Sequence, residues 1–159
     1  MKFSAQEEYG LRCLMAIAHQ GSLTIPELSK LEGLSQPHVA KLLSVLRKAD
    51  FVKSTRGQTG GYVLSREPGS IVIGDVMSAL GGRLYESGFC DRYAGIQAEC
   101  AHTVGCSLRE LWSKVQSAVD QVVNQVTLKD MMANSEESAP TLRLQSAPRK
   151  ASMDPVAPR

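Results

Sequence analysis

The chain has 159 residues, of which 43% are apolar, and a formal net charge of +2. This length suits one domain with an accessory element, and the apolar content excludes an intrinsically disordered protein. No apolar run approaches the ~20 residues that a membrane span needs, and the first residues lack the apolar core of a secretory signal. The chain is therefore expected in the cytoplasm, with no membrane association.

The charge is unevenly spread along the chain. Residues 1–66 carry nine Lys/Arg and five Asp/Glu, residues 67–134 carry five and eight, and residues 135–159 carry four and three. The net charges of the three parts are therefore +4, −3 and +1. A basic N-terminal part beside an acidic one fits a head that binds nucleic acid on a body that does not.

Two capping boxes predict the first two helices. Ser4 with Glu7, and Thr24 with Glu27, have the spacing at which a hydroxyl and a carboxylate satisfy each other's free backbone N–H groups. The first helix is expected to end near Gly21, because glycine is the usual stop residue.

The second and third helices have the proportions of a helix-turn-helix. The second is expected to end at Gly33, and Ser35 to cap a third helix that runs to about Ala49. In this motif the later helix enters the major groove of DNA. The candidate DNA contacts on its outward face are Gln36, His38, Lys41, Ser44, Arg47 and Lys48. A solvated helix face would carry similar residues, so this face alone leaves both interpretations open.

Residues 51–65 are expected to form a strand, a glycine-rich reversal and a return strand. A hairpin directly after three helices is typical of a winged helix, in which an arginine at the tip enters a narrow minor groove. The alternative is an ordinary hairpin with a solvated arginine, and the preceding helices favour the wing. The candidate contacts here are Ser54, Arg56, Gly57 and Gly60.

The rest of the chain divides into three parts. Residues 71–80 predict a strand-like start and a helix that completes a winged helix-turn-helix domain over residues 1–80. Residues 81–106 are expected to form a cysteine-rich, cluster-binding loop. Beyond Ala133 the chain turns to Ser, Ala and Pro, so residues 135–159 are expected to be a disordered tail.

Residues 107–134 predict a dimerisation helix and a short terminal helix. Ser107 and Glu110 suggest a third capping box at its start. A heptad seam follows, with spacings of 4, 3, 4, 3 and 4: Leu108, Trp112, Val115, Val119, Val122 and Val126. Because the head already buries its own apolar residues, this seam predicts a homodimer. The fold class is thus mainly α with a small β-wing.

Three of the four cysteines, Cys90, Cys100 and Cys106, lie in the expected loop. In the cytoplasm such cysteines are more often ligands or reactive thiols than disulfides. Soft thiolates select iron–sulfur clusters, zinc or copper(I). Zinc sites usually use closer cysteine pairs, so the wide spacing favours a cluster, either 2Fe–2S or 4Fe–4S. Cys13 falls at helical spacing in the first helix and is expected in the core.

The chain resembles the IscR/NsrR-type iron–sulfur winged-helix regulators over residues 1 to about 134. The resemblance rests on "MKFSAQEEYGLRCL", "GLSQPHVAKLLSVLRKADFVKSTRGQTGGYVL", "IVIGDVMSAL" and the three cysteines followed by "LRELW". It implies a homodimer that binds double-stranded DNA through the third helix and the wing. It also implies a cluster held by the three cysteines, in a loop near the head of the partner subunit.

Two departures from the family pattern concern the cluster ligands. The gap between the first two cysteines is longer than the five residues usual in the family. Where the IscR branch has a ligand histidine the chain has Arg109, which stays protonated and offers no lone pair to iron. Resemblance to the NsrR branch points to Glu8, from the first helix of the partner subunit, as the fourth ligand. His102 is a local rival, Glu8 could simply be solvated, and water or a small thiol could fill the position.

These features predict a DNA-binding transcriptional regulator, more readily a repressor, whose DNA affinity is controlled by a cluster that senses redox, nitric oxide or iron–sulfur status. One alternative is a cluster-free thiol-redox or zinc-stabilised regulator, and another is a winged helix used for protein contacts. The sequence shows no Ser/His/Asp arrangement, phosphate-binding loop or suitably paired carboxylates, and an enzyme is therefore not expected.

Overall fold

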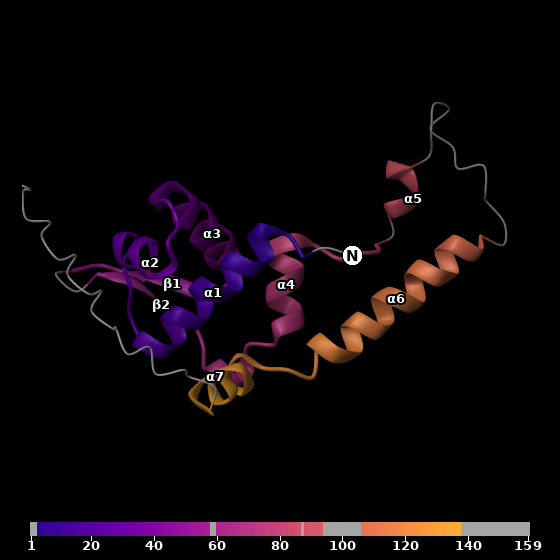
Figure 1. Cartoon of the computed structure of the whole chain (residues 1–159). Coiled ribbons are helices and arrows are strands. Elements are labelled where there is room, and N and C mark those ends of the chain that lie inside the picture. Colours follow the sequence, from indigo (N-terminus) through magenta and orange to yellow (C-terminus); the bar gives the residue numbers. More distant parts are fainter. Residues whose placement is uncertain (1–2, 58–59, 87, 94–105, 138–159) are drawn as a thin grey trace, which may run out of the picture.

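The computed structural model describes residues 3–57, 60–86, 88–93 and 106–137 (Figure 1). Helices dominate these ranges, with one two-stranded antiparallel sheet. The elements are α1 (Ala5–Gln20), α2 (Ile25–Glu32), α3 (Gln36–Lys48), β1 (Val52–Thr55), β2 (Gly61–Leu64), the 3-10 turn η1 (Pro68–Ser70), α4 (Ile73–Gly81), α5 (Phe89–Arg92), α6 (Ser107–Val123) and α7 (Leu128–Glu137). The expected mainly α fold with a small β-wing is confirmed.

The two N-terminal capping boxes form as predicted. The Glu7 carboxylate accepts from the Ser4 backbone N–H at 2.6 Å, and the Ser4 hydroxyl accepts from the Glu7 N–H at 3.2 Å. Thr24 and Glu27 make the same exchange at the start of α2. Gly33 ends α2 with a φ of 67°, in the left-handed region that favours glycine. Local chemistry therefore sets the limits of these two helices.

The hydrophobic core lies between α1, α3 and α4, and α1 is its centre. Helix α1 packs against α2, α3, α4, β2 and α7. The side chains that are fully buried there are Cys13, Leu14, Ile17, Leu28, Val39, Leu42, Leu43, Leu46, Ile71, Val76 and Leu128. The strands pair from Val52 opposite Leu64 to Thr55 opposite Gly61, so the hairpin extends directly from this core. The result is a winged-helix head.

The chain leaves the head after α4 and returns to it at α7 (Figure 1). Helix α6 ends at Val123, and the chain then rejoins the start of α4. The Ile73 N–H donates to the Val126 carbonyl at 2.9 Å, and the Leu128 N–H donates to the Ile71 carbonyl at 2.9 Å. Val126 therefore packs against the head. The heptad spacing had predicted that it continues the seam on α6, and this prediction is wrong for Val126.

Three other expectations differ from the structure. The predicted capping box of Ser107 with Glu110 does not form. Cys106 occupies the N-cap position of α6, and the Glu110 carboxylate accepts a hydrogen bond from Lys114 at 2.7 Å. The expected loop contains the short helix α5. Helix α7 continues to Glu137, beyond the boundary expected at residue 134. None of the helices in the described ranges is long and apolar enough to cross a membrane.

Candidate DNA-binding surface and cysteine site

Helix α3 presents a polar face because its apolar face is locked into the core. Val39, Leu42, Leu43 and Leu46 are all fully buried. Of the six residues of this helix predicted to contact DNA, the structure leaves four exposed and two, His38 and Ser44, half-buried. The exposed four are Gln36, Lys41, Arg47 and Lys48. Three of these four carry a positive charge, which suits a phosphate backbone.

His38, the remaining predicted contact on α3, is engaged in packing. Its ring is half-buried and meets the Tyr9 ring of α1 edge to face, with centroids 5.6 Å apart. The Arg12 guanidinium lies 5.5 Å from the centroid of the same tyrosine and pairs with Glu32 at 2.7 Å. His38 thus helps to fix α3 on α1, and a DNA contact from it stays a prediction.

The wing has a tight tip that carries one exposed arginine. Ser54 and Arg56 are exposed, and Gly57 has a φ of 121°, which L side chains rarely adopt. A Cβ atom on Gly60 would lie 2.8 Å from the Gly57 carbonyl oxygen and 2.9 Å from that of Thr55. Both glycines are therefore required by the backbone of the tip. Residues 58–59 lie outside the described ranges.

Two of the three predicted cysteine ligands share one pocket. Cys90 on α5 and Cys106 at the start of α6 are both half-buried and line a pocket of about 170 Å³. The other lining residues are Tyr85, Phe89, Tyr93, Leu108, Arg109 and Trp112. Cys100 and His102 lie outside the described residues. Within the described part of the chain, no three His, Cys, Asp or Glu side chains are grouped so that they could hold a metal ion.

Arg109 meets Cys90 as a hydrogen-bond donor. The hydrogen bond to the Cys90 side chain raises the pKa of Arg109 above its ordinary value, with smaller contributions from the charges of Cys90, Tyr85 and Cys106. A group that stays protonated offers no lone pair to iron. Arg109 instead brings positive charge to the pocket that Cys90 and Cys106 line.

Glu8 and the cysteines line different surfaces of one chain. Glu8 is exposed on α1, in an open groove that also includes Leu31 of α2 and Met131 of α7. Glu7 is held by Ser4 as predicted, which leaves Glu8 as the carboxylate available on this turn. A contact between Glu8 and the cysteine pocket thus requires a second copy of the chain.

Cys13 lies in the core, as predicted. Its side chain is fully buried, and burial raises the pKa of its thiol to about 11, with a smaller contribution from the charge of Glu32. A thiol that is buried and protonated is a poor nucleophile and a poor ligand. Cys13 is therefore separate from the cysteine site.

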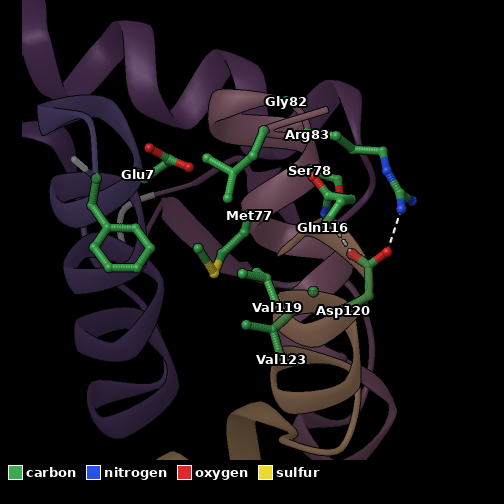
Figure 2. A pocket seen from close by; sticks show the side chains of 12 residues that line it. Glu7, Met77, Ser78, Gly82, Arg83, Gln116, Val119, Asp120 and Val123 are labelled. Carbon is green, nitrogen blue, oxygen red and sulfur yellow. Dashed lines mark hydrogen bonds and ion pairs between the residues drawn. The ribbon is translucent and has the colours of Figure 1, made fainter. Parts of the chain in front are cut away.

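Gln116 was not found from the sequence. It lies on α6 beside a small pocket between α1, α4 and α6 (Figure 2), and only 6% of the residue is exposed. Its Nε2 donates to Asp120 at 2.8 Å. The spacing of four residues between these two polar side chains was the one available signal.

Three helices, a hairpin and a projecting helix with a thiol-lined pocket define a winged-helix transcription regulator with an accessory arm. A family profile described as "Rrf2: Iron-dependent Transcriptional regulator" matches residues 3–134. The chain belongs to the Rrf2 family of transcriptional regulators.

Relatives within this family carry different names. The chain is 31% identical over 139 residues to the HTH-type transcriptional regulator CymR of Bacillus subtilis. This alignment covers 86% of this chain and 93% of that protein. It is 33% identical to protein rrf2 of Nitratidesulfovibrio vulgaris, with coverages of 85% and 89%. The solved structure of T. potens IscR superposes with a TM-score of 0.70 at 31% identity, covering 88% of this chain and 92% of that one. The chain is thus a DNA-binding regulator similar to all three.

Proposed function

We propose that the chain regulates transcription through an iron–sulfur cluster held by Cys90, Cys100 and Cys106. The observation that carries this proposal is the shared pocket of Cys90 and Cys106, which are 16 positions apart in the sequence. Thiolates grouped in this way select soft metal centres. Cys100 lies between them in the sequence and would complete the set, and the family match is to an iron-dependent regulator.

The chemistry of the donor set fits such a cluster. Two thiols face a pocket lined largely by aromatic rings, with Phe89 packed 4.9 Å from Tyr93 and 5.3 Å from Tyr85 between ring centroids. The aromatic lining and the hydrogen-bond donor Arg109 are both features that tune cluster potentials. When bound, the cluster would supply one-electron chemistry. The chain's own part is to hold it and to link its state to the position of α6.

Anaerobic purification tests this proposal. A cluster-bearing protein is brown, absorbs near ~400 nm and contains both iron and acid-labile sulfide. A colourless protein with no sulfide after anaerobic reconstitution would overturn the cluster assignment.

A thiol-redox regulator is the second candidate, and the Arg109–Cys90 contact favours it. Cationic side chains are typical neighbours of reactive cysteines. The relative CymR is described as the global cysteine regulator of Bacillus subtilis. A colourless preparation whose DNA affinity changes when a disulfide forms between Cys90 and another cysteine would identify this function.

Arg56→Ala in the wing is expected to weaken DNA binding by about tenfold without unfolding the head. The side chain is exposed, so no packing is lost. If the arginine enters the minor groove, the loss of affinity should be greater on A/T-rich flanks.

Lys41→Ala and Arg47→Ala should each lower the salt dependence of binding, with little change in sequence preference. Fluorescence anisotropy at several salt concentrations measures both effects. Unchanged affinity in all three variants would exclude docking through α3 and the wing.

Glu8→Ala is expected to keep the cysteine ligands but change the absorption spectrum and uncouple DNA affinity from cluster state. The reason is that Glu8 of the partner subunit would supply the fourth ligand and so tie that head to the cluster. Glu8→Asp keeps an oxygen at shorter reach and should be intermediate. His102→Ala is the matched control. A spectrum that changes in His102→Ala and not in Glu8→Ala would place the fourth ligand within one chain.

A further inference from the structure

Gln116 joins the beginning of the cysteine segment to the middle of α6. Within the described part of the chain it is the one buried polar side chain. Its Oε1 accepts from the Tyr85 backbone N–H at 2.9 Å, and its Nε2 donates to Asp120 Oδ1 at 2.8 Å. Both ends of the amide are therefore satisfied, which fixes its orientation.

Arg83 closes the same network from the other side. Its guanidinium pairs with Asp120 Oδ2, the oxygen that Gln116 leaves free (Figure 2). Arg83 and Tyr85 lie directly after α4, whereas Gln116 and Asp120 share one face of α6. The network of Arg83, Tyr85, Gln116 and Asp120, here the α6 clasp, thus attaches the exit from α4 to α6 by one ion pair and one hydrogen bond, and the Gln116–Asp120 hydrogen bond within α6 connects the two.

The α6 clasp has a geometric consequence for the thiols. The Tyr85 ring packs on Phe89, the residue before Cys90, and both rings line the pocket of Cys90 and Cys106. Cys106 is itself the N-cap of α6. The position of Cys106 is therefore set by the start of α6. The position of Cys90 is set through Phe89, which packs on Tyr85, and the backbone of Tyr85 is held by Gln116. The distance between the two thiols depends on both attachments.

We propose that Gln116 is a positioning residue for the Cys90–Cys106 pair. The α6 clasp keeps the two thiols on one pocket before anything binds there, so that the site is preorganised. The importance of this pair as a sensing site rests on the proposed function. The positioning itself requires no bound group, and it can be measured on the reduced, cluster-free protein.

The test is the rate at which a short bifunctional thiol reagent, dibromobimane, joins Cys90 to Cys106 within one chain. The parent is the full chain with Cys100→Ser, reduced and cluster-free; the buried Cys13 does not compete. Gln116→Met keeps the side-chain length but removes both hydrogen bonds, and is expected to slow cross-linking about tenfold. Arg83→Met removes only the exposed ion pair and should slow it about twofold. Lys114→Met, which breaks the exposed Lys114–Glu110 pair on the same helix, should leave the rate unchanged.

Circular dichroism checks that the helix content of the protein is unchanged, and a denaturing gel separates links within a chain from links between chains. Rates equal to the parent in both Gln116→Met and Arg83→Met would overturn the proposal. If Gln116→Met does not fold, Arg83→Met against Lys114→Met decides. Slowed cross-linking in these variants, with no uptake of iron and sulfide by the chain that retains all four cysteines, would support the α6 clasp and reject the cluster. Unchanged cross-linking in the variants, with uptake of iron and sulfide by the chain that retains all four cysteines, would reject the α6 clasp and support the cluster.

Discussion

Cys90→Ala and Cys106→Ala are each expected to remove the visible absorption, iron and sulfide of the anaerobically purified protein almost completely. Three thiolates would supply most of the ligation, and two remaining ones cannot retain the cluster. Cys100→Ala should behave in the same way. Absorption spectra with iron and sulfide analysis measure the loss.

Cys13→Ala is the matched control for these variants. It removes a thiol from the core, where it leaves a small cavity and costs about 1 kcal/mol of stability, but it does not touch the cysteine pocket. Its spectrum should equal that of the unaltered protein. Bleaching in Cys13→Ala, together with a normal spectrum in Cys90→Ala, would show that the ligands have been assigned wrongly.

A double substitution on α6, Leu111→Glu with Val122→Glu, is expected to convert the proposed homodimer into monomers. Leu111 is 50% exposed and Val122 65% exposed in the single chain, and neither lines the cysteine pocket. Val122 belongs to the α6 seam, and Leu111 lies beside it, one turn before Val115 on the same side of the helix, so a dimer along the seam would bury both. Two unpaired carboxylates there would cost about 4 kcal/mol, or about a thousandfold in the dimer dissociation constant. Affinity for a palindromic site should fall with it, because two linked heads bind together.

Light scattering during size-exclusion chromatography measures the mass, and Ser113→Glu is the control. Ser113 is also exposed on α6 but lies about 180° around the helix from Val122. It should leave the dimer intact. A dimer that survives the double substitution would show that the seam on α6 is not the interface between subunits.

The head could be predicted from the sequence because local chemistry and spacing determine it. Ser4 with Glu7, and Thr24 with Glu27, are signals that a helix carries within one turn, and both boxes form. The box at Ser107 failed because Glu110 has a competing partner, Lys114, one turn further on. Sequence spacing alone does not rank two such local partners.

For the part of the chain that carries the cysteines, the sequence predicted which residues form the site but not how the helices and loops around them are arranged. The grouping of Cys90 with Cys106 follows from chain spacing, whereas α5 is too short to show a helical period. Val126 fits the heptad spacing, but its backbone carbonyl bonds to Ile73 and ends the seam. Gln116 accepts a hydrogen bond from the backbone of Tyr85, 31 positions earlier in the chain, and no local pattern reveals this contact. Tertiary contacts therefore decided what the sequence left open.

The hydrogen bond between the Tyr85 backbone and Gln116 makes the segment between these two residues an insertion with adjoining ends, outside the packed head. A segment whose ends already touch can be lengthened, shortened or exchanged at little cost to the fold that carries it, because closing the loop costs little more as the loop grows. The winged-helix head, which includes α4, is thus the constant DNA-reading part, and the segment between Tyr85 and Gln116 is the replaceable part. This architecture lets one DNA-reading fold accept different chemical signals, since a new arm needs only to begin and end at the same two neighbouring points.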